Sequence, residues 1–166
     1  MAFEKISIDS LSVNPVRMFS DGWALLSVND GGRFNSMTVS WGALGELWGK
    51  DVAICFVRPQ RYTYEFMENN EYFSLSFFDS HKQELGVFGR KSGRDCDKYA
   101  ETGLTPVTDG EFEYCAEAQY VFLCRKIAFQ DMSPDGFLDK SIGDCYSAHD
   151  YHRTYVGEIV SVLKRI

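Results

Sequence analysis

Two arginines three residues apart stand where an apolar run gives way to polar residues. The run over residues 54–57 ends at Arg58, and Arg61, Tyr62 and Thr63 follow it. Guanidinium groups and hydroxyls at the start of a helix are suitable donors for a phosphate or another dianion. The alternative is that both arginines pair with surface acids, which are plentiful in this chain. The residues alone leave both interpretations open.

A second segment combines an amide, three hydroxyls and an indole in seven residues: Asn35, Ser36, Met37, Thr38, Val39, Ser40 and Trp41. If it is a strand, side-chain alternation places Ser36, Thr38 and Ser40 on one face. Such a row of hydroxyls is suited to hydrogen bonds with a polar heterocycle or a phosphate. The alternative is the solvent-facing side of a half-buried strand.

A third segment, residues 89–98, carries four cations: Arg90, Lys91, Arg94 and Lys98. Ser92 and Gly93 can offer backbone donors to an anion, and the Lys98 ammonium can reach a phosphate as a point charge. The alternative is a solvated loop in which Asp95 and Asp97 balance the cations.

Two histidines, His149 and His152, lie three residues apart near the end of the chain. A metal site would need further ligands, and the pattern supplies none, so no metal is expected. We expect His152 to line a ligand pocket just before the last strand. The sequence has no glycine-rich phosphate-binding motif between a strand and a helix, so a nicotinamide cofactor would not bind through a Rossmann unit.

The composition limits the partners and the compartment. A chain of 166 residues suits a single domain over 1–166, and a net charge of −7 argues against nucleic acid. No apolar run approaches the length of a membrane span. The first residues lack a basic start and an apolar centre, so no secretory signal is predicted and the expected location is cytoplasmic.

Hydrophobic patterning predicts a protein that is mainly β with short helices. Strands are expected at residues 23–28, 34–40, 52–57, 72–78, 120–129 and 155–163. Helices are expected at 62–69, with Thr63 as a possible cap, at 82–87 and at 97–102. The three glycines of residues 41–49 predict a loop. Because helices do not alternate regularly with strands, an antiparallel barrel with helical insertions is favoured over a doubly wound sheet.

Taken in order along the chain, these segments resemble the flavin reductase-like FMN-binding family, and in particular its flavoredoxin-type branch. The matching pieces are residues 35–42, 57–63, 92–95 with Lys98, and 151–159. The resemblance implies an FMN-binding split β-barrel of antiparallel Greek-key type. It also implies a homodimer with the flavin at or near the subunit interface.

The resemblance assigns roles to the residues described above. Asn35, Ser36, Met37, Thr38, Ser40 and Trp41 would line the isoalloxazine and the ribityl chain. The phosphate would be surrounded by Arg58, Arg61, Tyr62, Thr63 and Lys98, with Ser92, Gly93 and Arg94 closing the pocket. His152 would help to place a nicotinamide.

The function implied is an FMN-binding oxidoreductase that moves electrons from NAD(P)H through FMN to an acceptor. The alternative is a flavoredoxin-type electron carrier whose bound FMN exchanges electrons with a redox protein partner. A third possibility is a flavin-binding module without catalysis.

Overall fold

The computed structural model describes residues 2–166, and antiparallel strands dominate it. The strands are β1 (Phe3–Ile6), β2 (Ala24–Asp30), β3 (Arg33–Val39), β4 (Gly42–Leu47), β5 (Lys50–Val57), β6 (Tyr72–Phe77), β7 (Pro106–Asp109), β8 (Phe112–Cys115), β9 (Tyr120–Asp131) and β10 (Arg153–Arg165). Seven of them form one curved sheet in the order β3-β2-β6-β9-β10-β5-β4, and β1 pairs with the end of β10. The fold is thus the antiparallel split barrel that the sequence predicts.

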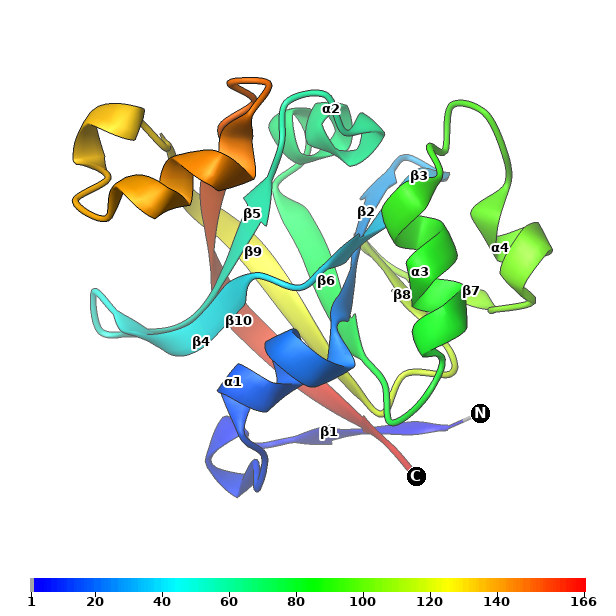
Figure 1. Cartoon of the computed structure of the whole chain (residues 1–166). Helices are drawn as coiled ribbons and strands as arrows, with labels where there is room; N and C mark the ends of the chain where they lie inside the picture. Colours follow the sequence, from blue (N-terminus) through cyan, green and yellow to red (C-terminus); the bar gives the residue numbers. More distant parts are fainter. Residues whose placement is uncertain (1) are drawn as a thin grey trace.

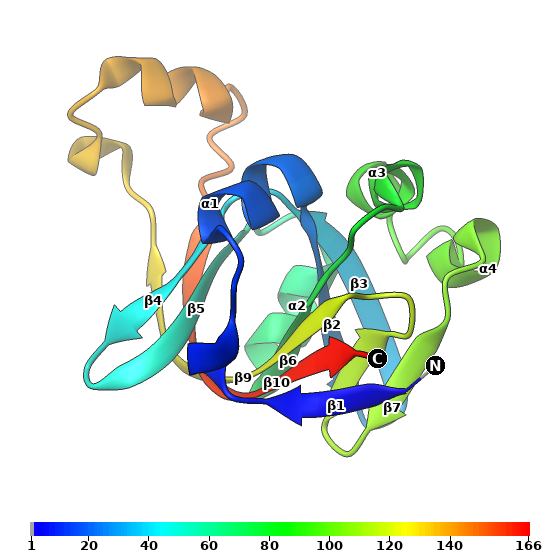
Figure 2. The same cartoon turned by 90° about the horizontal axis from the view of Figure 1, so that it is seen from below.

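Short helices cover the ends and one side of this barrel (Figure 1). They are α1 (Pro15–Arg17), α2 (Tyr62–Asn69), α3 (Lys82–Arg90) and α4 (Lys98–Thr102), with a π-helix η2 (Met18–Gly22) and the 3-10 helices η1 (Ile8–Ser10), η3 (Pro134–Gly136) and η4 (Lys140–Tyr146). Figure 2 shows α3 and α4 on the side of β3, and the segment with η3 and η4 projecting at the far side of β5. No helix in residues 2–166 is long and apolar enough to cross a membrane.

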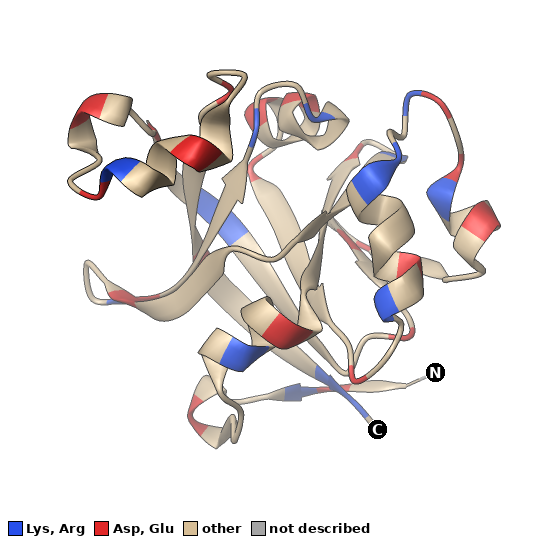
Figure 3. Ribbon diagram, in the orientation of Figure 1, with Lys and Arg blue, Asp and Glu red and all other residues tan. Residues whose placement is uncertain are grey.

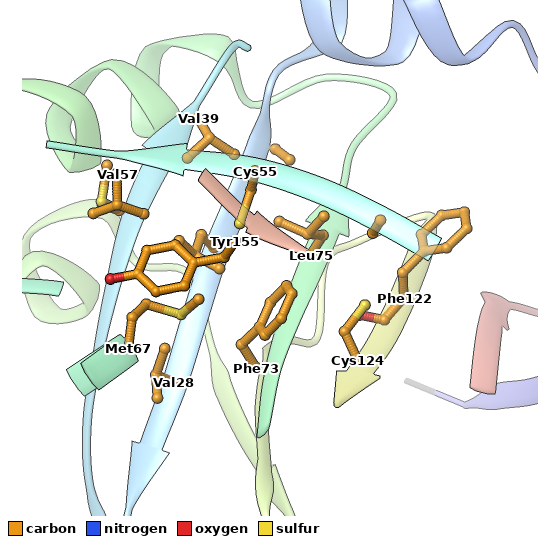
Figure 4. Close-up of a cluster of buried hydrophobic side chains, with 14 of the residues drawn as sticks. Val28, Val39, Cys55, Val57, Met67, Phe73, Leu75, Phe122, Cys124 and Tyr155 are labelled. Atoms are coloured by element: carbon orange, nitrogen blue, oxygen red, sulfur yellow. The ribbon is translucent and has the colours of Figure 1, made fainter. Parts of the chain in front are cut away.

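The barrel is filled by one large apolar cluster (Figure 4). Tyr155, Phe73 and Phe122 are its largest fully buried side chains, and the thiols of Cys55 and Cys124 pack among them as small apolar groups. A second cluster, which includes Leu85, Phe88 and Tyr99, lies between the sheet and α3 and α4. The two clusters pack against opposite faces of β3, the strand along which the candidate site lies.

Gly157 in β10 is required by the packing of this core. A Cβ at this position would overlap the ring of Phe73, which is 1% exposed and cannot move aside, and would lie 3.0 Å from the Cβ of Cys124. We expect Gly157→Ala to lower the free energy of unfolding by about 1–3 kcal/mol, the usual cost of overpacking. Urea denaturation measures this as a lower midpoint with an unchanged slope. Gly45→Ala in β4, where a Cβ would meet nothing within 4 Å, is the matched control. Equal effects of the two substitutions would contradict the packing argument.

Most predicted elements are confirmed within a few residues, but two predictions are wrong. Residues 41–49 are not a loop: Gly42–Leu47 form β4, which pairs with β5 through a turn at Trp48 and Gly49. Gly42 is present because the Phe19 ring packs against it, so it reports a close approach rather than a break. Thr63 does not cap α2 either. The cap residue is Arg61, and the Thr63 side chain is buried in a hydrogen bond with Asn35.

Candidate functional site

A row of neighbouring cavities, which share lining residues, follows β3 between the turn before α2 and the loop from α3 to α4. One cavity, of about 210 Å³, is called here the cationic cavity. Its lining residues are Asn35, Met37, Gln60, Arg61, Tyr62, Thr63, Arg90, Lys91, Ser92, Gly93 and Lys98. The structure therefore brings together residues from the three segments 35–41, 58–63 and 89–98, which the sequence marks as candidates for binding an anion or a polar heterocycle.

Among residues 2–166, three cations of this cavity have no acidic partner: Arg61, Lys98 and the exposed Arg90. Arg61 donates from Nη1 to the Gly89 carbonyl (2.6 Å) and from Nη2 to the Phe88 carbonyl (3.1 Å), in the last turn of α3. Lys98 is 5% exposed, donates to the Ser36 carbonyl and lies 5.3 Å from the centre of the Phe88 ring. No carboxylate among residues 2–166 forms an ion pair with either side chain.

Burial and neighbouring positive charge both act on the pKa values of Lys98 and Arg61. Burial, and then the charge of nearby Arg61, lower the pKa of Lys98 to about 8. Burial, and then the charge of Arg58, lower the pKa of Arg61. Each cation is destabilised by dehydration and by a like charge, so an anion entering the cavity would relieve both.

Arg58 behaves differently from Arg61. Its Nη1 donates to Asp150 Oδ2 at 2.5 Å, its Nη2 donates to the Cys145 carbonyl at 2.9 Å, and it lies over the Tyr146 ring. The Arg58 guanidinium holds the pKa of Asp150 below its usual range, with a smaller contribution from Gln60. Arg58 is therefore in the surface ion pair that the alternative interpretation described, and its side chain anchors the segment before β10.

The loop between α3 and α4 also divides its cations. Lys91 pairs with Glu101 at 2.5 Å, and Arg94 pairs with Glu65 and lies 4.6 Å from the centre of the Tyr62 ring. The acids inside the loop do not balance these cations, since Asp97 instead caps α4 by accepting from the Ala100 amide. Figure 3 shows basic positions at the end of α3 and at the start of α4, on either side of this loop.

The hydroxyls of β3 do not form the free row that alternation suggested. Ser36 is buried and hydrogen-bonds with Ser27 and Tyr99, whereas Thr38 donates to the Leu85 carbonyl at 2.5 Å. Only Ser40 is exposed. Because α3 and α4 cover this face, neither a solvent-facing strand nor a continuous row of free hydroxyls describes it.

Asn35 and Gly93 meet at one edge of the cationic cavity. The Asn35 amide donates to Thr63 Oγ1 at 2.7 Å, and a Cβ on residue 93 would overlap the Asn35 side-chain oxygen. The loop can approach β3 this closely only because residue 93 is glycine.

At the other end of this row of cavities the lining side chains are largely aromatic. A cavity of about 190 Å³ is lined by Trp41, Phe56, His152, Arg58 and residues 37–40, and a smaller one links it to Arg61. The His152 ring lies 5.2 Å from Trp41, and His152 Nδ1 is 2.8 Å from the Tyr146 hydroxyl. Burial, and then the charge of Arg58, lower the pKa of His152 to about 4, so the imidazole is neutral at pH 7.

Several residues that shape these cavities are not among the site residues predicted from the sequence. Gln60, Phe56 and Arg90 line them, and Tyr146 and Asp150 hold His152 and Arg58 in place. Arg90 could have been predicted as a site residue, because it belongs to the cationic segment. Tyr146 could not, since its contact with His152 depends on the course of η4. Among residues 2–166, no group of His, Cys, Asp and Glu side chains is arranged to hold a metal ion.

The donor set suits an elongated ligand with an anionic end and a flat end. Arg61 and Lys98, which lack an acidic partner among residues 2–166, would face the anion. The backbone of Gly93 lies beside it, and Trp41 and His152 border the flat end. A flavin mononucleotide has this form, with a phosphate at one end and an isoalloxazine at the other.

Comparison with known proteins gives one family match and a set of similar solved structures. The family model described as flavin reductase-like domain matches residues 16–165. An FMN-binding domain of a flavin reductase-like enzyme from Shewanella baltica OS155 is 15% identical, with a TM-score of 0.71 over 98% of this chain and 77% of that one. The flavoredoxin of Desulfovibrio vulgaris (Miyazaki F) is 20% identical, with a TM-score of 0.68 over 98% of this chain and 77% of that one.

A third solved structure contains nucleotides. It is an NADH:FAD oxidoreductase from Streptomyces globisporus C-1027 in complex with NAD and FAD fragments, 13% identical, with a TM-score of 0.66 over 87% of this chain and 74% of that one. These similarities establish the fold. A search of curated proteins found no match.

Proposed function

The chain belongs to the flavin reductase-like domain family, and from this premise we propose that it is an FMN-binding oxidoreductase that takes electrons from NAD(P)H and passes them to an acceptor. Bound FMN would supply the redox chemistry, accepting a hydride equivalent and releasing electrons singly or in pairs. The protein would supply binding, orientation and electrostatics. The proposal includes a homodimer, as in the resemblance described above.

One observation carries the proposal: Arg61 and Lys98 converge on one cavity of an acidic protein without an acidic partner in the described chain. Burying an uncompensated cation costs free energy, and a buried charge is normally paired. An anionic ligand supplies the missing partner. The phosphate of FMN fits this position, and residues 37–41 extend from it toward Trp41 and His152.

In this assignment each residue binds or orients part of the flavin or of the nicotinamide. Arg61 and Lys98 hold the phosphate, Ser92 and Gly93 offer backbone donors beside it, and Tyr62, Thr63 and Arg94 form the wall around it. Asn35, Ser36, Met37, Thr38, Ser40 and Trp41 border the ribityl chain and the ring. His152, held by Tyr146, helps to place the nicotinamide as a neutral side chain. Arg58 acts through Asp150 on the shape of the pocket, since its guanidinium is already paired.

Two measurements test the proposal. The purified protein should bind FMN, seen as a change in flavin absorbance and fluorescence. With FMN present it should oxidise NADH or NADPH, followed as loss of absorbance at the nicotinamide band. Absence of FMN binding would refute the flavin site. Binding without oxidation of either nucleotide would refute the reductase function and leave the site intact.

A second candidate function is that of a flavoredoxin-type electron carrier. The similarity to a flavoredoxin and the net charge of −7 favour it, because an acidic surface steers a basic redox partner. FMN that NAD(P)H cannot reduce, but that a reduced electron-transfer protein can, would favour this function over the first.

A further inference from the structure

A second and larger cavity adjoins the cationic cavity. Its volume is about 400 Å³, and it shares Asn35, Gly93 and Lys98 with the cationic cavity. Its other lining residues are Phe34, Ser36, Arg94, Asp95, Cys96, Asp97 and Tyr99. FMN would end at its phosphate in the cationic cavity, so FMN alone leaves this adjoining cavity unexplained.

The charges in the adjoining cavity differ from those beside it. Asp95 and Asp97 line it and are exposed. The Asp95 side chain forms no hydrogen bond or ion pair within residues 2–166, and Asp97 uses Oδ1 for the Ala100 amide at 3.0 Å. Arg94 is already paired with Glu65. The available charges are therefore two carboxylates, with the Lys98 ammonium at the boundary between the two cavities.

The cavity also has a flat apolar wall. The Phe34 ring is partly exposed and is fixed edge-on against Tyr99, with 5.5 Å between the ring centres. Tyr99 itself is buried and hydrogen-bonds with Ser36, so Phe34 has a rigid support. An aromatic ring held in this way can stack on a planar heterocycle.

These three features match the parts of an adenosine nucleotide. The aromatic wall suits the base, the two carboxylates suit the ribose diol, and the cation at the boundary suits the phosphate. Ribose hydroxyls donate to carboxylates, which is how an acidic residue recognises a free 2′-hydroxyl elsewhere. A 2′-phosphate would instead be repelled by Asp95 and Asp97. We propose that this cavity binds the adenosine portion of a dinucleotide whose ribose 2′-hydroxyl is free.

This inference rests on the proposed function, because Lys98 would join the phosphate in this cavity to the flavin phosphate. The adenosine could come from FAD, in which it is attached to the flavin, or from NADH. NADPH would be disfavoured in the second case. The cavity thus predicts a preference that the cationic cavity alone does not.

The direct test is a calorimetric titration of FMN-saturated protein with AMP and with adenosine 2′,5′-bisphosphate. We expect AMP to bind at least roughly tenfold more tightly, because the second ligand places a phosphate against two carboxylates. Asp95→Asn should reduce this preference to about threefold or less. Asp51→Asn is the matched control, since Asp51 is exposed at the start of β5, across the molecule from α4 in Figure 1, and it should keep the wild-type ratio. No saturable binding of AMP, or equal binding of the two ligands, would overturn the inference.

Further arms separate the two sources of adenosine and separate this inference from the flavin site. If FAD supplies the adenosine, AMP should compete with FAD but not with FMN. If NADH supplies it, AMP should raise the KM for NADH. If AMP competes in neither of these two assays, the inference is overturned. FMN affinity is measured by fluorescence on the same samples, and AMP is also titrated without FMN, so loss of the flavin site is seen independently.

Discussion

Arg61→Ala is expected to weaken FMN binding about 100-fold, equivalent to ~2.7 kcal/mol, and to leave riboflavin binding nearly unchanged. Riboflavin has the same ring and ribityl chain but no phosphate, so the difference between the two ligands isolates the anionic end. The reason for a large effect is that Arg61 lies in a partly dehydrated cavity and that no acid among residues 2–166 neutralises it. Fluorescence titration of both flavins against the free protein measures both affinities.

Two further variants make this result interpretable. Arg61 also donates to the Gly89 and Phe88 carbonyls, so its removal could disturb the end of α3. Arg61→Lys keeps the charge but loses the paired geometry, and should recover part of the FMN affinity. Arg17→Ala, which removes an exposed arginine near Asp21, should change neither affinity. Equal losses for FMN and riboflavin in Arg61→Ala would show that the cationic cavity does not bind the phosphate.

The strands were largely predictable because their signals are local. Residues 72–77 and 120–124 are largely apolar runs, and the barrel buries most of them as the pattern requires. β4 was not predicted because a glycine can either interrupt a strand or allow another group to pack closely against the backbone. Sequence alone cannot choose between them when the contacting ring, Phe19, is 23 residues away.

The candidate site was predictable as a set of segments but not as a set of contacts. Arg58 and Arg61 look alike in the sequence, yet one meets Asp150 and the other meets helix carbonyls. The difference arises because the segment before β10 folds back over the turn at residues 58–60. Ser36 and Thr38 likewise appear free until α3 and α4 cover them. Long-range packing decides which polar groups remain available to a ligand.

Lys98→Met should have opposite effects on stability and on binding. In the free protein the Lys98 ammonium is buried, near Arg61, and without an acidic partner in the described chain, so replacing it with a neutral side chain of similar length should raise the free energy of unfolding at pH 7. The same change should weaken FMN by roughly 100-fold, because the phosphate loses a charged donor. Urea denaturation without ligand and flavin titration give the two quantities.

The pH dependence has a definite sign. The pKa of Lys98 is about 8 in the folded chain and 10.5 in its ordinary state, so between these values the unfolded chain binds the proton more strongly. The stability of the free wild-type protein, relative to Lys98→Met, should therefore be lowest below pH 8 and should rise as the pH increases toward 10.5. FMN affinity should do the reverse. The FMN phosphate is a dianion throughout, so affinity should fall by up to about tenfold per pH unit above pH 8 as Lys98 loses its proton.

These two trends discriminate between roles for Lys98. If the ammonium served only to support the fold through the Ser36 carbonyl, Lys98→Met would destabilise the free protein. If it served only as a solvated surface charge, neither stability nor FMN affinity would change with its ionisation. A free protein that becomes more stable while it loses FMN and the pH dependence of FMN binding is the result expected of a buried cation kept for an anionic ligand.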